Sequence, residues 1–184
     1  MKTFIKTIII LLFIGIPFSG CDDVESLADI PFTTSFSGDV DVVVSASVSL
    51  ASAKIDAVSF SGKATIDPQS DSNIKKYIDK LKSSDVQEVT GTFKKVSKPV
   101  QITTGSLSIS QGSKSASWSI KNFDVANGAK IILDSGEGQW ATINQILMSK
   151  NKFDAKITGT VDNDDVSFTV TIYIKSNFIA NPLK

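Results

Sequence analysis

Three segments of the chain alternate apolar and polar side chains, and this pattern constrains the fold more than any other feature. They are residues 39–50, 153–161 and 166–174. A period of two residues is that of a β-strand with one buried face. In the last segment the inward side chains are expected to be Val166, Phe168, Val170 and Ile172, and the outward ones Ser167, Thr169 and Thr171. Truncating Phe168 should therefore cost far more stability than truncating Thr169.

The spacing of the strands predicts one antiparallel domain. The second and third segments flank Asp162-Asn163-Asp164-Asp165, a polar loop of hairpin length. Weaker strand patterns cover residues 57–66, 86–96, 102–110, 116–123 and 130–133. We therefore predict a mainly β fold over residues 32–184, an antiparallel β-sandwich of immunoglobulin-like or Greek-key type with seven to nine strands.

Two short helices are predicted in the connections between strands. In the first, Ile74, Tyr77, Ile78 and Leu81 follow the spacing of one helix face, and Asp71 or Ser72 can cap its start. The second covers residues 139–150 and places Trp140, Ile143 and Leu147 on one stripe. The Gly-rich segment 134–138 before it lacks the spacing of a phosphate loop, so it is expected to be a turn.

The composition excludes several classes of function. The chain has no histidine, no arginine and a single cysteine. Histidine-based catalysis, zinc sites of the His/Cys type, arginine clamps and intramolecular disulfides are therefore excluded. No cofactor is expected. Without Lys2 and Lys6 the chain keeps 17 Lys against 19 Asp plus Glu, a net charge of −2, so no nucleic-acid partner is expected.

The N-terminus has the layout of a secretory signal. Lys2 and Lys6 precede an apolar run over residues 8–16, which is followed by Pro17 and the small pair Ser19-Gly20. The run is shorter than the ~20 apolar residues that span a bilayer. Residues 1–20 are therefore interpreted as a signal peptide.

The only cysteine directly follows this segment, in Phe18-Ser19-Gly20-Cys21. The tetrapeptide resembles a lipobox, the processing site of bacterial lipoproteins, with Phe18 where an aliphatic residue is usual. The resemblance implies that the chain is cleaved before Cys21 and that this residue carries the acyl chains that bind the membrane. Two or more chains give stable anchoring. The alternative interpretation is a free or intermolecular thiol.

An acidic tract follows, and residues 21–31 are interpreted as a tether. Asp22, Asp23 and Glu25 resemble the export signal of Bacteroidota lipoproteins, which implies the exterior face of the outer membrane. A solvated spacer would have a similar composition. The chain as a whole resembles small surface lipoproteins of flavobacterial or Bacteroides type that carry an all-β, immunoglobulin-like sandwich domain.

Other charged residues are weaker candidates for a site. Asp162, Asp164 and Asp165 could coordinate calcium, but the calcium-loop spacing is absent and such residues also favour turns. A solvated helix face is the simpler interpretation of four lysines near the first helix, and a basic patch for lipid headgroups or acidic glycans is the alternative. These lysines are Lys75, Lys76, Lys80 and Lys82.

A carboxylate-based glycan-active enzyme needs only two acids near the scissile bond. Glu88 and Glu137 are candidates, but Trp118 and Trp140 lie in patterns that point their side chains inward, away from a sugar platform. We therefore assign no catalytic residue and expect no enzyme.

Two hypotheses of different class remain. The first is a non-catalytic surface module for adhesion, glycan contact or envelope assembly. The second is a carrier that encloses an apolar ligand such as a lipid. Helices packed flat on a filled core would favour the module, whereas a large apolar pocket would favour the carrier.

Replacing Cys21 with Ser should abolish lipidation, because acylation needs a thiol and the chain has no other cysteine. Cells fed labelled fatty acid provide the measurement, with the parent protein as the control. A variant that still carries label and sediments with membranes would contradict the lipoprotein interpretation.

Overall fold

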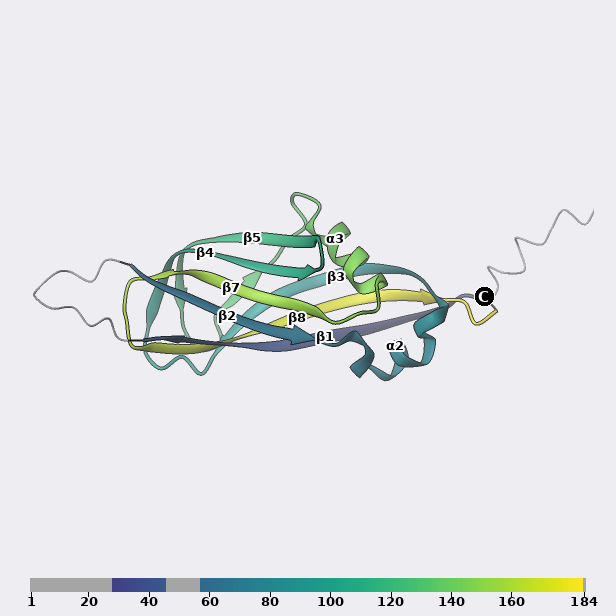
Figure 1. The fold of residues 1–184 in the computed structure, drawn as a ribbon, viewed down its shortest axis with the longest axis horizontal. Helices are drawn as coiled ribbons and strands as arrows, with labels where there is room; N and C mark the ends of the chain where they lie inside the picture. The colour runs from purple at the N-terminus through teal and green to yellow at the C-terminus, as the bar shows by residue number, and fades with distance from the viewer. Residues whose placement is uncertain (1–27, 46–56, 184) are drawn as a thin grey trace, which may run out of the picture.

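Two antiparallel sheets packed face to face form the protein in a computed structural model that describes residues 28–45 and 57–183 (Figure 1). The mainly β sandwich predicted from the sequence is confirmed. The strands of the described residues are β1 (Ile30–Val44), β2 (Val58–Ile66), β3 (Leu81–Lys94), β4 (Val100–Gln111), β5 (Lys114–Val125), β6 (Lys130–Ile132), β7 (Phe153–Val161) and β8 (Val166–Ala180).

The strand order is that of a jelly roll. One sheet has the order β1-β8-β3-β6 and the other β2-β7-β4-β5, with all paired strands antiparallel. An eight-stranded double sheet built from Greek keys has this architecture, whereas immunoglobulin domains pair their strands in a different order. The Greek-key form of the prediction therefore holds and the immunoglobulin-like form does not. Alternation along a strand specifies its faces but not its neighbours.

Most element boundaries differ from those predicted by a few residues, and two of these differences change the assignment of a segment. β1 begins at Ile30, inside the segment interpreted as a tether, because Ile30 and Pro31 pair with Ala180 and Ile179 of β8. The predicted inward residues Val48 and Leu50 lie outside the described residues. The first helix ends before Leu81, which is the first residue of β3 and pairs with Ala180.

The central strand β8 tests the predicted alternation. Val166, Phe168, Val170 and Ile172 are at most 2% exposed, as expected. Thr169 lies on the opposite face but is only 3% exposed, which corrects the prediction that it faces solvent. β8 lies between β1 and β3, so Asp41 and Lys94 flank Thr169, and its Oγ1 donates to Asp41 Oδ1 at 2.6 Å.

Aromatic rings join the two sheets in the middle of the core. Phe168 of β8 packs against Phe60 of β2 and Phe93 of β3, with centroid distances of 5.6 Å in both pairs. Phe93 in turn stacks on Phe123 of β5 at 5.2 Å. Because Phe60 and Phe123 belong to one sheet and Phe93 and Phe168 to the other, this cluster spans the interior.

The sandwich also closes tightly where β1 passes β2. A Cβ added at Gly62 would lie 2.7 Å from the backbone oxygen of Asp41 and 2.8 Å from side-chain atoms of Val40 and Val42. Only a residue without a side chain fits this approach, which explains a glycine in the middle of a strand.

Both predicted helices are present. The first consists of η1 (Pro68–Ser70), α2 (Ser72–Tyr77) and η2 (Ile78–Lys80), and Asp71 caps α2 by accepting from the backbone of Asn73 and Ile74. Of the two capping candidates, Asp71 is thus the one used. No helix of the described residues is long and apolar enough to cross a membrane.

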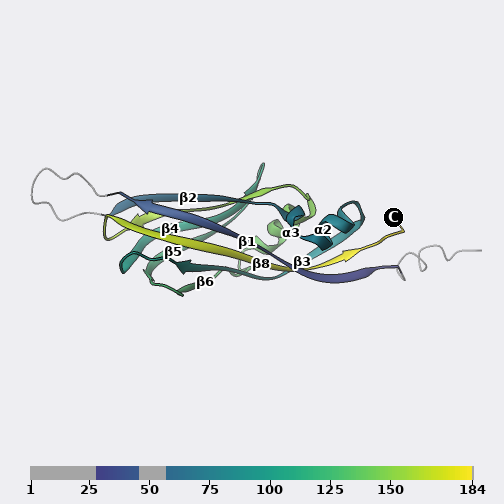
Figure 2. The same cartoon turned by 90° about the horizontal axis from the view of Figure 1, so that it is seen from below.

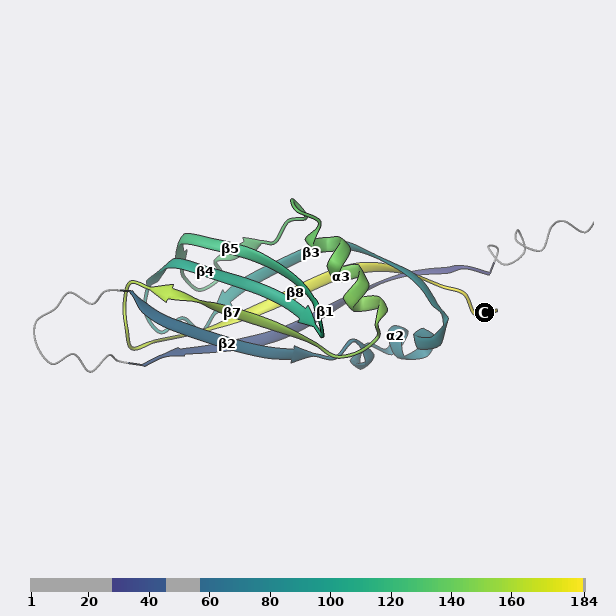
Figure 3. The same ribbon diagram turned by 45° about the horizontal axis from the view of Figure 1, so that its top comes forward.

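The second helix, α3 (Gln139–Met148), lies against β3 and β5 (Figures 2 and 3). The predicted inward positions of both tryptophans are confirmed. Trp118 is 8% exposed and its Nε1 donates to the oxygen of Asp134, while Nε1 of Trp140 donates to the oxygen of Leu133. These two bonds fix the chain between β6 and α3.

Phe168→Ala should lower the free energy of unfolding by about 3–5 kcal/mol, because it empties a site between the sheets. Thr169→Ala should cost about 1–2 kcal/mol, since it removes a shielded hydrogen bond to a carboxylate. Thr171→Ala is the matched control, because Thr171 makes the same bond, to Asp39 at 2.6 Å, in an exposed position. Urea unfolding of the mature chain with Cys21→Ser measures all three. Equal midpoints for Phe168→Ala and Thr171→Ala would contradict the assignment.

Candidate binding surfaces

The outer face of the β2-β7-β4-β5 sheet carries hydroxyl groups in rows across the strands. The strand registers place side chains opposite one another, and two neighbouring rows are Ser61–Thr158–Ser106–Ser119 and Lys63–Lys156–Ser108–Ser117. Strands in a sheet are about 4.8 Å apart and every second residue points to the same face. The result is a flat polar lattice, here called the hydroxyl face.

Several hydroxyls of this face have no partner in the part of the chain that the structure describes. Ser106 bonds Ser117 at 2.8 Å and Thr104 bonds Thr160 at 2.9 Å. Within the described residues, the hydroxyl groups of Ser61, Ser108 and Ser119 make no hydrogen bond to a protein atom. These groups can bind water or a ligand without breaking a bond inside the protein.

Two lysines oppose each other on the same face. Lys63 and Lys156 are directly paired across β2 and β7, a position in which like charges repel. Lys63 forms an ion pair with Asp154 at 2.9 Å. Its hydrogen bond, together with one from Thr65, lowers the pKa of Asp154 below its ordinary value. In the part of the chain that the structure describes, Lys156 is exposed and has no such partner.

On the outer face of the β1-β8-β3-β6 sheet, several polar groups bind one another. Thr169 and Thr171 of β8 donate to Asp41 and Asp39 of β1, and Lys130 forms an ion pair with Glu88 at 3.0 Å. A ligand would have to compete with these contacts, whereas Ser35, Ser37 and Lys175 of the same face are exposed and make no side-chain contact of this kind within the described residues.

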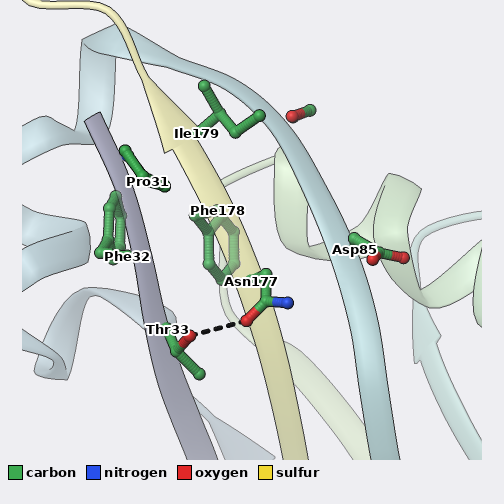
Figure 4. A pocket seen from close by; sticks show the side chains of 8 residues that line it. Pro31, Phe32, Thr33, Asp85, Asn177, Phe178 and Ile179 are labelled. Carbon is green, nitrogen blue, oxygen red and sulfur yellow. Dashed lines mark hydrogen bonds between the residues drawn. The ribbon is translucent and has the colours of Figure 1, made fainter. Parts of the chain in front are cut away.

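A groove of about 430 Å³ lies near the end of this second sheet (Figure 4). Phe32 and Phe178 stack below it with centroids 5.6 Å apart. Thr33 Oγ1 donates to Asn177 Oδ1 at 2.6 Å on the same side of the strands as Ile179. The groove is open to solvent and its rings are largely covered, so it offers an apolar ligand little enclosed surface.

The aspartate cluster lies in the connection between β7 and β8, which belong to different sheets, so the hairpin suggested by the length of this loop is not formed. The aspartates have structural contacts instead. Asp162 Oδ1 accepts from the backbone nitrogen of Gln101 at 2.9 Å, and the Asp162 nitrogen donates to the Gln101 oxygen at 3.1 Å. Asp165 adopts a φ of 50°, a conformation that Asp tolerates in turns. Asp164 also makes an interaction. The described residues contain no group of three potential metal ligands from His, Cys, Asp and Glu.

The two glutamates considered for catalysis lie on different elements. Glu88 belongs to β3 and pairs with Lys130, whereas Glu137 lines a polar hollow of about 210 Å³ beside Gly138 at the start of α3. Nothing in these contacts resembles two carboxyl groups that flank a shared substrate.

The lysines of the first helix are not one continuous patch. Lys82 lies on β3 and pairs with Asp29 at 2.8 Å, and the Lys76 ammonium lies 4.8 Å from the ring centroid of Tyr77. Lys75 is exposed and Lys80 is half-buried. The proposed lipidation site Cys21 and the acidic residues Asp22, Asp23 and Glu25 lie outside the described residues.

Sequence reasoning missed the hydroxyl face as a unit. Alternation indicates that these residues point outward, but the strand order and register that bring Ser61, Thr158 and Ser106 into one row come from pairing between distant segments. The high Ser and Thr content of the outward positions is the only signal in the sequence.

Comparisons with known proteins do not assign this chain to a family. No family model matches the chain, and no curated protein does. Among solved structures, a decameric BFDV capsid protein matches with a TM-score of 0.42 and 8% identity over 81% of this chain and 99% of that chain. Desmodium yellow mottle tymovirus matches with a TM-score of 0.31 and 10% identity over 84% of this chain and 91% of that chain.

Proposed function

We propose that the chain is a lipoprotein of the outer membrane, anchored through Cys21, whose sandwich acts as a non-catalytic binding module on the exterior of the cell. Its ligand is a glycan or another polar component of the envelope, bound at the hydroxyl face. The observation that carries this proposal is the exposed ammonium of Lys156 near Ser61 and Ser108, whose hydroxyls have no partner among the described residues.

The chemistry of the face suits a polyhydroxylated ligand with acidic groups. Neutral hydroxyls both donate and accept, which matches the mixed hydrogen-bonding groups of a sugar. The ammonium of Lys156 adds an attraction for a carboxylate or sulfate, and hydrogen bonds to charged groups are the stronger ones. A flat face without aromatic platforms favours many weak contacts along an extended chain over one deep site.

The packing of the helices supports a module rather than a carrier. Ile143 and Ile146 of α3 are fully buried, and Ile74 of α2 is 1% exposed. The phenylalanine cluster occupies the middle of the sandwich between the sheets. A carrier needs an apolar cavity in that position.

The anchor and the exterior location rest on the N-terminal sequence. Phe18-Ser19-Gly20-Cys21 supports lipidation and Asp22, Asp23 and Glu25 support export to the outer face. The described part of the chain starts beside its C-terminal end, so an anchor at Cys21 would leave the opposite end and both sheet faces free (Figure 1).

Lys156→Ala should weaken retention on immobilised acidic polysaccharides severalfold, because it removes an exposed ammonium in the middle of the hydroxyl face that has no carboxylate partner among the described residues. Lys175→Ala is the matched control, because Lys175 is an exposed lysine in the middle of the other sheet and also lacks an ion-pair partner in the described residues. Equal retention of both variants and the parent would remove the support for this face. Urea midpoints of the variants show whether either change affects folding.

Changing Asp22, Asp23 and Glu25 together to Ala should preserve lipidation and reduce exposure at the cell surface. Protease treatment of intact cells, followed by detection of the remaining protein, measures the exposed share. The control is the same treatment after the outer membrane has been permeabilised, where parent and variant should be cleaved alike. Equal cleavage on intact cells would reduce the acidic tract to a spacer.

A further inference from the structure

Exposed apolar side chains gather at one end of the molecule. The exposed large hydrophobic residues of the described chain are Ile30, Val43, Ile132, Ile179 and Leu183. Three of them, Ile30, Ile179 and Leu183, lie where β1 begins and β8 ends, and we call these three the basal tip. Figures 1 and 2 show both ends of the described chain at this end.

The basal tip is held in place by the fold. Ile30 pairs with Ala180, and the nitrogen of Asn181 donates to the oxygen of Lys80 at 2.8 Å. Asp29 accepts from Asn181 Nδ2 at 3.0 Å and forms the ion pair with Lys82. The apolar side chains therefore keep their position, which lowers the entropy lost when they contact another surface.

Positive charge lies beside the basal tip. The segment Ser72–Lys80 contains Lys75, Lys76 and Lys80 and one acid, Asp79, so it carries a charge of +2. α2 packs on β1 near this end, where Phe32 lies 5.7 Å from Tyr77. Lysines next to exposed apolar residues suit a membrane surface, because the ammonium groups reach anionic headgroups while the apolar groups enter the interface.

The position of the proposed lipid anchor indicates that the surface in contact with the basal tip is a membrane. Cys21 precedes Ile30 by nine residues, a length that spans at most about 30 Å. Val43 lies at the other end of the same strand, thirteen residues and about 40 Å farther away. Ile30 of the basal tip is thus closer along the chain to the acyl chains than Val43 is.

We propose that the basal tip rests in the interfacial layer of the lipid bilayer and holds the sandwich upright on the membrane. The proposal rests on the lipid anchor of the proposed function. Acyl chains alone would fix the protein to the surface without fixing its orientation. Contacts of the basal tip with lipid would keep the hydroxyl face perpendicular to the membrane, where long glycans can reach it.

The experiment uses the mature, lipidated chain in vesicles of phosphatidylethanolamine and phosphatidylglycerol. Leu183→Cys and Val43→Cys each introduce one thiol that can be labelled, because acylation blocks Cys21. Leu183 is 69% and Val43 73% exposed, so the two label sites are matched in accessibility. An environment-sensitive fluorophore and quenching by iodide report whether each label leaves water, and Ile179→Cys gives a second position on the basal tip.

Labels at Leu183 and Ile179 should shift to shorter wavelength in vesicles and lose iodide quenching severalfold, while the label at Val43 stays unchanged. Vesicle flotation separates the two proposals. Protein that floats with unchanged labels at Leu183 and Ile179 would overturn the basal-tip proposal and leave the anchor intact. Protein that does not float would overturn both. A shift that appears without vesicles and grows with protein concentration would identify a second copy as the occupant and overturn the lipid assignment.

Discussion

Contact between the two sheets through Phe60, Phe168, Phe93 and Phe123 is the interaction on which the rest of the structure depends. The single cysteine rules out an intramolecular disulfide, so the fold relies on burial of apolar surface. Only closely packed sheets can exclude water from these rings, and Gly62 allows this approach beside β1. Every polar group that is available for binding consequently lies on an outer face, at an end or in a connection.

The sequence predicted the parts of this fold that depend on local periodicity. The inward residues of β8, the cap of α2 by Asp71 and the buried stripe of α3 all follow from side-chain spacing along one element. The sandwich itself follows because several half-buried strands must cover one another's apolar faces.

Features that depend on neighbours in space were not predictable in this way. The alternation along β8 predicts that Thr169 faces solvent. Its position between β1 and β3 buries it, and it donates a hydrogen bond to Asp41. Leu81 continues the helical spacing after Ile78, yet pairing with β8 places it in β3. The jelly-roll order and the rows of the hydroxyl face likewise result from register between segments that are distant in sequence.

The two outer faces pair their polar groups in different ways. On the β1-β8-β3-β6 sheet, Thr169 and Thr171 bind carboxylates, so a ligand that bonds these hydroxyls must break existing hydrogen bonds. On the hydroxyl face, Ser61 and Ser108 have no protein partner among the described residues, so a ligand exchanges with water alone. Because net hydrogen-bond energies are small differences between such exchanges, a ligand that bonds the unpaired serines loses less than one that bonds the paired threonines of β8.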